Sequence, residues 1–280
     1  MRLTKVAPDK AEEWVDRAIQ LGVMVDGGDN FVLFHQDGPE TINQNGIGLS
    51  FQKNDNSRLS HTLVNQLDSL GDPRLNVFSW VESGGPHKGL PNGFNELTLA
   101  QHPGGSDLTT YSRVNSALIQ PASPMVFQHS GEVHLLLAEA AVRGWYNGDA
   151  NAHYEMGVQQ SMEIWSWYDP SFWISEDDIA NYLSANSLDV SAEAVALERV
   201  HSEFWVATFL NPYESYANWR RTGLPDLTPV SFSGSDSFGA IPRRLRYPQK
   251  EYSLNQENIQ TAVERQGADL MTTRVWWDAQ

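Results

Sequence analysis

The chain has 280 residues, a formal net charge of −16 and no cysteine. This length can bury a large hydrophobic core, while the lack of cysteine excludes disulfides, thiolate metal sites and a cysteine nucleophile. The negative charge argues against a nucleic-acid partner, because the phosphate backbone requires a positively charged binding surface. No stretch approaches the roughly 20 apolar residues that a membrane-spanning helix needs.

The spacing of apolar residues predicts a mainly α-helical protein. Apolar side chains recur at helical intervals in several segments, and Ser, Asn or Pro at the starts and Gly at the ends are typical helix boundaries. The first segment begins at Pro8 with a start that resembles a capping box. The predicted helices cover residues 8–22, 58–70, 131–144, 154–165, 176–185, 191–210, 211–222 and 255–267.

Two of these helices have the pattern of a tetratricopeptide-type pair. The helices that begin near 131 and 154 are joined by the short turn WYNGDA, and small residues such as Ala140 and Gly157 lie on their apolar faces. Small residues at facing positions allow two helices to pack closely, as in stacked helical repeats. An ordinary helix hairpin has the same pattern, so both interpretations stay open.

Long loops rich in Gly and Asn separate the helices. They cover 26–56, which has room for a short hairpin, 76–112 and 223–250. Loops of this length are usually functional when they are ordered. The sequence therefore predicts a helical scaffold whose Gly-rich loops form a ligand-binding face.

Aromatic side chains in these loops are the candidate ligand contacts. An aromatic ring can stack on the apolar face of a sugar, while amide and imidazole groups hydrogen-bond its hydroxyls. The alternative is that the rings anchor their loops to the helical core. The candidate binding residues are Trp80, Phe51, Phe94, Asn92 and His87.

Acidic side chains offer weaker signals for catalysis or metal binding. Glu132 and Glu139 lie two helical turns apart, a separation that can span a sugar in a glycoside hydrolase. Asp26, Asp29 and Asn30 are oxygen ligands suited to calcium, although an Asx turn explains them better. The dispersed histidines and the absence of HExxH give no metal motif. We expect no catalytic residue, no metal and no cofactor.

Basic residues cluster late in this acidic chain. They occur in NWRRTG, with Arg220 and Arg221, and in IPRRLRYP, with Arg243, Arg244 and Arg246. Arg can stack on aromatic rings or form bidentate pairs with carboxylates. With many acidic residues available, structural ion pairing is favoured over ligand binding.

Taken in order, several segments resemble the SusD/RagB family, with the whole chain similar to its C-terminal portion. The segments are SRVNSALIQPASPMVFQHSGEVHLLLAEAAVRGW, GDANAHYEMGVQQSM, NWRRTGLPDL, IPRRLRYPQKE and NIQTAVERQGADLMTTRVWWD, preceded by HKGLPNGFN. The resemblance implies a non-catalytic, surface-exposed glycan-binding protein of the bacterial outer membrane. It also implies a SusC-like TonB-dependent transporter as the partner that receives the glycan.

The same resemblance implies features that this sequence does not show. Members of the family carry a signal peptide, a lipidated Cys and a helical N-terminal region, so we expect residues 1–280 to form a single SusD-like domain that lacks this region, in a fragment or a mis-started gene. Membrane association through a lipid anchor would then lie outside this chain. Trp219, Arg220, Arg221, Trp276 and Trp277 are interpreted as fold determinants.

Two other functions remain as alternatives: a glycoside hydrolase acting on a polysaccharide, and a scaffolding repeat protein.

Overall fold

The computed structural model describes residues 1–38, 43–54, 56–232 and 234–279. Helices dominate it, which confirms the mainly α class. The helices are α1 (Pro8–Leu21), α2 (Gly46–Lys53), α3 (His61–Ser69), α4 (Arg74–Phe78), α5 (Glu96–Leu99), α6 (Ser130–Val142), α7 (Ala150–Glu163), α8 (Glu176–Ala185), α9 (Glu193–Ala207), α10 (Pro212–Thr222), α11 (Gln249–Leu254) and α12 (Gln256–Gln266). The strands are β1 (Phe31–Leu33), β2 (Ser79–Trp80), β3 (Arg113–Val114) and β4 (Met125–Gln128). None of the helices in the described parts of the chain has the length and apolar character that crossing a bilayer requires.

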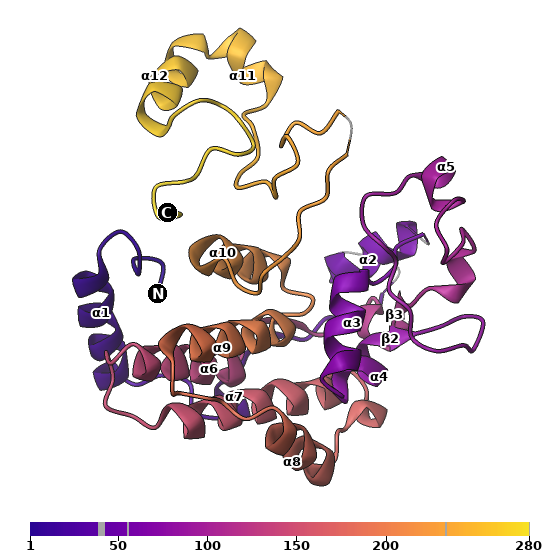
Figure 1. Ribbon diagram of the computed structural model, residues 1–280, viewed down its shortest axis with the longest axis vertical. Helices are drawn as coiled ribbons and strands as arrows, with labels where there is room; N and C mark the ends of the chain where they lie inside the picture. Colours follow the sequence, from indigo (N-terminus) through magenta and orange to yellow (C-terminus); the bar gives the residue numbers. More distant parts are fainter. Residues whose placement is uncertain (39–42, 55, 233, 280) are drawn as a thin grey trace.

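Helices α6, α7 and α9 form the centre of the molecule, with α1 at one end and α2 to α5 at the other (Figure 1). Helices α6 and α7 pack closely because both carry Gly where they meet. A Cβ atom on Gly131 would lie 2.8 Å from the carbonyl oxygen of Gly157, and a Cβ on Gly157 would lie 2.8 Å from Cγ of Leu135. No other residue fits at that separation, and the predicted close pair of helices is confirmed.

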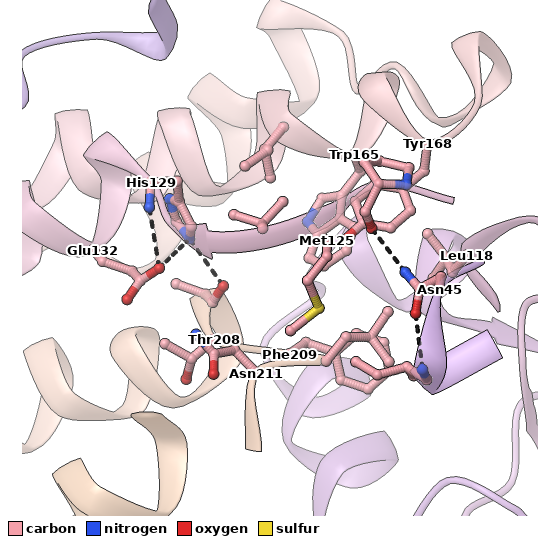
Figure 2. Close-up of a pocket in the computed structure, with 16 residues that line it drawn as sticks. Asn45, Leu118, Met125, His129, Glu132, Trp165, Tyr168, Thr208, Phe209 and Asn211 are labelled. Carbon is pink, nitrogen blue, oxygen red and sulfur yellow. Dashed lines mark hydrogen bonds and ion pairs between the residues drawn. The ribbon is translucent and has the colours of Figure 1, made fainter. Parts of the chain in front are cut away.

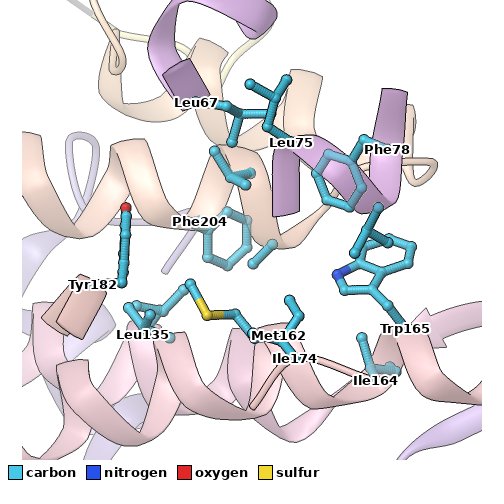
Figure 3. Packing of buried hydrophobic residues seen from close by; sticks show 14 of the residues in the cluster. Leu67, Leu75, Phe78, Leu135, Met162, Ile164, Trp165, Ile174, Tyr182 and Phe204 are labelled. Carbon is cyan, nitrogen blue, oxygen red and sulfur yellow. The ribbon is translucent and has the colours of Figure 1, made fainter. Parts of the chain in front are cut away.

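The hydrophobic core lies between this centre and α3, α4 and α8 (Figure 3). Phe78 links the two sides, because its ring stacks on Phe209 at 4.1 Å and meets the edge of Trp165 at 4.7 Å. Such aromatic pairs add to the free energy gained from burial alone. The core therefore fixes α4, and with it the β2–β3 ribbon that follows, against α9 and the end of α7.

The loop predicted over 26–56 is more regular than expected. It contains α2, whose first turn is capped by the Asn45 side chain, which accepts hydrogen bonds from the backbone of Ile47 and Gly48. It also contains β1, which pairs antiparallel with the distant β4 and not with a neighbouring strand of a local hairpin. Residues 39–42 and 55 of this predicted loop lie outside the described residues. The pairing of β1 with β4 was not predicted, because the partner strand lies far away in the sequence, where no local signal identifies it. On either side of residues 39–42 the backbone of Gln36 donates to the carbonyl of Asn43 at 3.1 Å, so a short hairpin at that point stays a prediction.

Other boundaries agree or differ by a few residues. Asn211 caps α10, and Ser175 caps α8, as predicted. Helix α9 begins at Glu193, because Ser191 is held in a turn by the Asp189 carboxylate. Asn255 precedes α12 without a capping hydrogen bond from its side chain. The segment 223–248 contains no helix or strand among its described residues, as expected of a loop.

The clustered Arg residues hold the C-terminal segment against α10, as the ion-pair interpretation predicts. The guanidinium of Arg220 lies 4.3 Å from the Tyr216 ring and 4.6 Å from the Trp277 ring. Arg243 lies 4.2 Å from the Trp219 ring, and its Nη1 is 3.3 Å from Oδ1 of Asp278. Further along, Arg244 binds Asp269 and Arg246 binds Asp236.

Trp276 differs from its expected role as a fold determinant. Its side chain is 71% exposed, whereas its neighbour Trp277 contacts the guanidinium groups of Arg2 and Arg220. The two residues are the central pair of a turn, which the backbone of Asp278 closes by donating to the carbonyl of Val275 at 2.9 Å, and only the second ring of the pair packs on the protein. The interpretation of Trp276 was therefore wrong, and Trp277 is the packed ring.

A buried ion pair joins α6 to α10. Both guanidinium nitrogens of Arg221 bind the Glu139 carboxylate, at 2.6 and 2.8 Å, and neither side chain is more than 1% exposed. Arg143 binds the same carboxylate at 2.9 Å. Burial alone would raise the pKa of Glu139, but Arg221 and His201 hold it well below its ordinary value. Glu139 is therefore charged in the folded protein.

A second buried cluster joins α4 to α9. Arg74 is fully buried and binds Asp72 at 2.6 Å and Glu203 at 2.7 Å. Its Nη1 also donates to Ser161 of α7 at 3.0 Å. The Tyr182 hydroxyl of α8 donates to the Glu203 carboxylate. Through this cluster, four helices share one set of polar contacts inside the core.

We predict that Arg221→Ala destabilises the protein by about 3–5 kcal/mol, because it removes the bidentate partner of a fully buried carboxylate and leaves Glu139 with only Arg143 and His201 beside it. Chemical denaturation followed by circular dichroism measures the loss. The matched control is Arg2→Ala, which removes a partly exposed pair with Glu214 and should cost about 0–1 kcal/mol. Equal losses in the two variants would contradict the role of the buried pair.

Candidate functional site

Two adjoining hollows lie between α3, α9, α10 and the loop that follows α10. They share Trp205, Leu227 and Ile241. The first has a volume of about 450 Å³ and the second a volume of about 440 Å³. We call them together the Trp205 groove. Trp205 is half-buried at the end of α9, so part of its ring faces the groove while the rest packs on the core.

The first hollow is apolar. Its lining is mostly aliphatic and aromatic, and its residues come from α2, α3, α9 and α10. Phe51 of α2 lines it and also packs against the core. Besides the three shared residues, the first hollow is lined by Ile47, Phe51, Leu63, Thr208, Phe209, Leu210, Pro212, Ser215, Tyr216 and Trp219.

The second hollow combines one aromatic ring with small neutral polar side chains. Phe232 is 50% exposed at its edge. Hydroxyl and amide groups surround it, and no acidic or basic side chain is among the described residues of its lining. The polar residues are Ser60, Thr62, Asn92, Thr228, Ser235 and Ser237.

Contacts with α10 and with the loop of Asn92 hold the outer wall of the groove in place. The Tyr216 hydroxyl donates to the carbonyl of Pro242 at 2.7 Å, and Arg220 donates to the carbonyl of Arg243 at 3.0 Å. On the other side, Val230 lies close to Gly93: a Cβ atom added to Gly93 would lie 2.3 Å from Cγ1 of Val230. The wall is thus attached at both ends.

The structure brings two of the sequence-predicted residues to this groove. Phe51 lines the apolar hollow and Asn92 lines the polar one. They come from separate parts of the chain, and only the fold places them near one another. Phe94 is not among the described residues that line either hollow; its ring is 43% exposed and meets His102 edge-on at 5.0 Å.

The other two predicted residues lie at the β2–β3 ribbon. Trp80 is 36% exposed, and the Arg113 guanidinium lies 5.7 Å from its ring. The His87 ring is held by hydrogen bonds to Ser79 at 2.7 Å and Asn76 at 3.0 Å. Neither Trp80 nor His87 is among the described residues that line the Trp205 groove.

The central residues of the groove are not evident from the sequence. Trp205 lies in a helix, where an aromatic residue usually indicates core packing. Phe232 lies in the segment 223–250, for which the sequence predicts a loop but no ligand contact. Its surroundings, LTPVSFSGSDSF, combine aromatic, Ser and Gly residues as the chosen loops do. That composition was the available signal.

The two glutamates considered for hydrolysis are buried in different places. Glu139 is bound by Arg221 and Arg143 in the core. Glu132 lines a small cavity of about 20 Å³, room for one water molecule, between α6 and the end of α9 (Figure 2). Its Oε1 accepts a hydrogen bond from the backbone of His129 at 3.2 Å. The two carboxyl groups do not face a common groove.

Burial shifts the acid–base properties of this cavity. Burial raises the pKa of Glu132 to about 8, although the hydrogen bond from His129 opposes the shift. Burial lowers the pKa of His129 to about 4, although the nearby carbonyl of Ala207 opposes it. Near neutral pH both side chains are therefore mostly uncharged.

The acidic turn near Asp26 is an Asx turn, as the sequence favoured. The Asp26 carboxylate accepts from the backbone of Gly28, and that of Asp29 accepts from Val25, each at 2.7 Å. The Asn30 side chain accepts from the backbone of Ser130 at 2.7 Å. These three side chains thus hold the backbone of the turn and the start of α6.

The sequence matches the SusD-like family described as starch-binding and associating with the outer membrane, over residues 1–248. No curated protein matches it. Among solved structures, a chitin-binding protein is 31% identical, with a TM-score of 0.88, and the match covers 100% of this chain and 62% of that one.

Two further structures show the same fold. A SusD homologue from Bacteroides thetaiotaomicron is 26% identical with a TM-score of 0.81, and the match covers 100% of this chain and 63% of that one. A chitin-binding SusD homologue from Flavobacterium johnsoniae is 25% identical with a TM-score of 0.80, over 100% of this chain and 60% of that one. The chain thus spans less than two thirds of the length of these structures.

The Glu132 cavity predicts a pH dependence of stability. The pKa of Glu132 is higher in the folded than in the unfolded protein. Its contribution to stability is therefore complete when the pH is below the unfolded pKa, and it is lost as the pH rises toward about 8. The lowered pKa of His129 has the opposite effect, because it makes stability increase as the pH rises from about 4 to 6.5. Between pH 6.5 and 8 only the Glu132 effect of the two remains, and ionisation of Glu132 should lower the free energy of unfolding by about 1–2 kcal/mol.

Glu132→Gln keeps an oxygen for the His129 backbone but cannot ionise, so it should remove this loss. Urea unfolding of both proteins, at pH values half a unit apart from pH 6.5 to 8, measures the free energy of unfolding that is lost. Glu13→Gln on the exposed face of α1 is the control and should keep the wild-type slope. A Glu132→Gln profile parallel to that of the wild type would refute the assignment.

Proposed function

Because this chain belongs to the SusD-like family of starch-binding proteins that associate with the outer membrane, we propose that it captures a glycan without catalysis in the Trp205 groove. The observation that carries the proposal is the polar hollow, where an exposed aromatic ring lies among neutral hydroxyl and amide groups. Phe232 offers a face for the apolar C–H surface of a sugar, and Asn92 and Thr228 offer hydrogen bonds to its hydroxyls.

The charge of the groove supports a neutral ligand. The chain carries a net charge of −16, yet no Asp, Glu, Lys or Arg is among the described residues that line the two hollows. A glycoside hydrolase places a pair of carboxyl groups on either side of the bond that it cleaves. The lining of the Trp205 groove favours binding over hydrolysis, and the bound glycan would leave unchanged.

The structure suggests an order of importance for the predicted binding residues. Asn92 contributes from the polar hollow and Phe51 from the apolar hollow. Phe94 lies outside both linings, two residues after Asn92, and would contact only the part of a glycan that extends beyond the groove. Trp80 and His87 would form a separate contact on the β2–β3 ribbon, reached only by a longer chain of sugars. Starch and chitin fragments are the first ligands to test, because the family and two of the similar structures are described by them.

We further propose that the protein acts at the bacterial cell surface and passes its glycan to a SusC-like TonB-dependent transporter. The description of the family as associating with the outer membrane supports this location. Co-expression with a TonB-dependent transporter encoded beside this gene should yield a complex that co-purifies. A transporter that elutes alone at every salt concentration would refute the partnership.

We predict that Phe232→Ala and Asn92→Ala each weaken glycan binding about fivefold, because each removes about 1 kcal/mol of contact. Isothermal titration calorimetry with starch and chitin oligosaccharides measures both. Trp173→Ala is the control, since this ring is 64% exposed but lies outside the lining of the groove.

Three outcomes would count against parts of the proposal. Full affinity in both groove variants would remove the Trp205 groove as the site, and full affinity in Trp80→Ala would remove the ribbon contact. New reducing ends after incubation with a polysaccharide, lost in a groove variant, would show hydrolysis in place of simple binding.

A further inference from the structure

Two histidines face each other across the α6–α7 pair. Nδ1 of His134, on α6, lies 3.0 Å from Nδ1 of His153, on α7. The ring centroids are 5.2 Å apart, so the two rings meet by the edges that carry these nitrogens. The glycan groove uses neither residue.

Backbone contacts determine which nitrogen of His134 carries hydrogen. Its Nε2 lies 3.0 Å from the carbonyl oxygen of Val25, which can only accept a hydrogen bond. Nε2 therefore carries the hydrogen, and Nδ1 presents a lone pair toward His153. A second hydrogen bond to the same carbonyl, from Gln160 at 3.0 Å, fixes the position of the carbonyl. An imidazole oriented in this way by a carbonyl is typical of metal ligands.

The distance between the two nitrogens suits a shared metal ion. Zn–N bonds of about 2.0–2.1 Å at angles between 90° and 110° place two ligand nitrogens about 2.9–3.4 Å apart. The observed separation of 3.0 Å lies in this range. The rings need only turn so that both lone pairs point at the ion, and His153 is partly exposed in the first turn of α7.

The surroundings keep His153 in the neutral form that binds metal ions. Burial, together with His134, lowers the pKa of His153, although the carboxylate of Asp149, which caps α7, opposes the shift. In the described parts of the chain, no third His, Cys, Asp or Glu completes a cluster of ligands. Water would therefore fill the remaining positions, as it does at the open position of a catalytic zinc site.

We propose that His134 and His153 form a binding site for a divalent transition-metal ion, Zn²⁺ above all. In the metal-free pair, neutral His153 donates its single hydrogen from Nδ1 to the lone pair on Nδ1 of His134. When the ion binds, this hydrogen leaves Nδ1 for solvent and solvent returns one to Nε2, so His153 changes tautomer with no net release of a proton. Once bound, the ion links α6 to α7 and, through His134, to the segment that follows α1.

Titration of the metal-free protein with ZnCl₂ tests the site. Calorimetry should show one ion per chain, and a zinc concentration ten times the dissociation constant should raise the melting temperature by about 2–4 °C. His153→Ala should lose both effects. His61→Ala, which removes an exposed histidine of α3, should keep them.

Nuclear magnetic resonance of the imidazole nitrogens in the wild type gives a second reading that does not depend on the folding of a variant. Zinc should shift the Nδ1 signals of His134 and His153 and leave that of His61 unchanged. No shift at these two nitrogens, or one-to-one binding that survives His153→Ala, would overturn the proposal.

Discussion

The ion pair between Arg221 and Glu139 is the contact on which the arrangement of the C-terminal half depends. It joins α10 to the central helix α6 with both charges fully buried, and Arg143 and His201 lie against the same carboxylate. A buried charge is tolerated only when such partners remain in place, so α10 has one position relative to α6. That position decides where the next segment of the chain can run.

The groove follows from this position. Helix α10 presents Tyr216 and Arg220 to the segment around 241–244, and hydrogen bonds from both side chains hold that segment down. Arg220 at the same time stacks between Tyr216 and Trp277, while Arg243 stacks on Trp219. The loop between these points is therefore held at both of its ends, and it forms the outer wall of the hollows beside Trp205. A scaffold of charged and aromatic contacts thus supports a binding surface that is itself neutral.

Buried polar groups are concentrated at the contacts between helices, which we call joints, and each of these contacts has a different chemistry. The joint of α4 with α9 is an Arg between two carboxylates, Asp72 and Glu203. Near the joint of α6 with the end of α9, Glu132 and His129 are neutral because burial shifts their pKa values toward the uncharged forms. The joint of α6 with α7 combines a close contact between two Gly residues with the facing His134 and His153. Charged joints specify orientation, whereas the Gly contact specifies distance.

Local patterns in the sequence were sufficient for the existence of the helices from α6 to α10, because their apolar periodicity, and the caps of α8 and α10, are contained in neighbouring residues. They were also sufficient for the structural role of the Arg clusters and for the family resemblance, since those motifs are contiguous. They were insufficient for β1, whose partner strand lies nearly a hundred residues away, and for Trp276, whose side chain turns to solvent.

The binding surface depended on tertiary structure for the same reason. Phe51 and Asn92 were recognisable as candidates from their loops, and the fold brings them to one groove, but it places Trp80 and His87 on a separate ribbon. Trp205 and Phe232 could be assigned to the groove only after α9, α10 and the loop after α10 had been placed together. By itself, the sequence determined the longer helices, the structural role of the late Arg clusters and the family. The tertiary structure decided which side chains share a surface, because that depends on contacts between residues far apart in the chain.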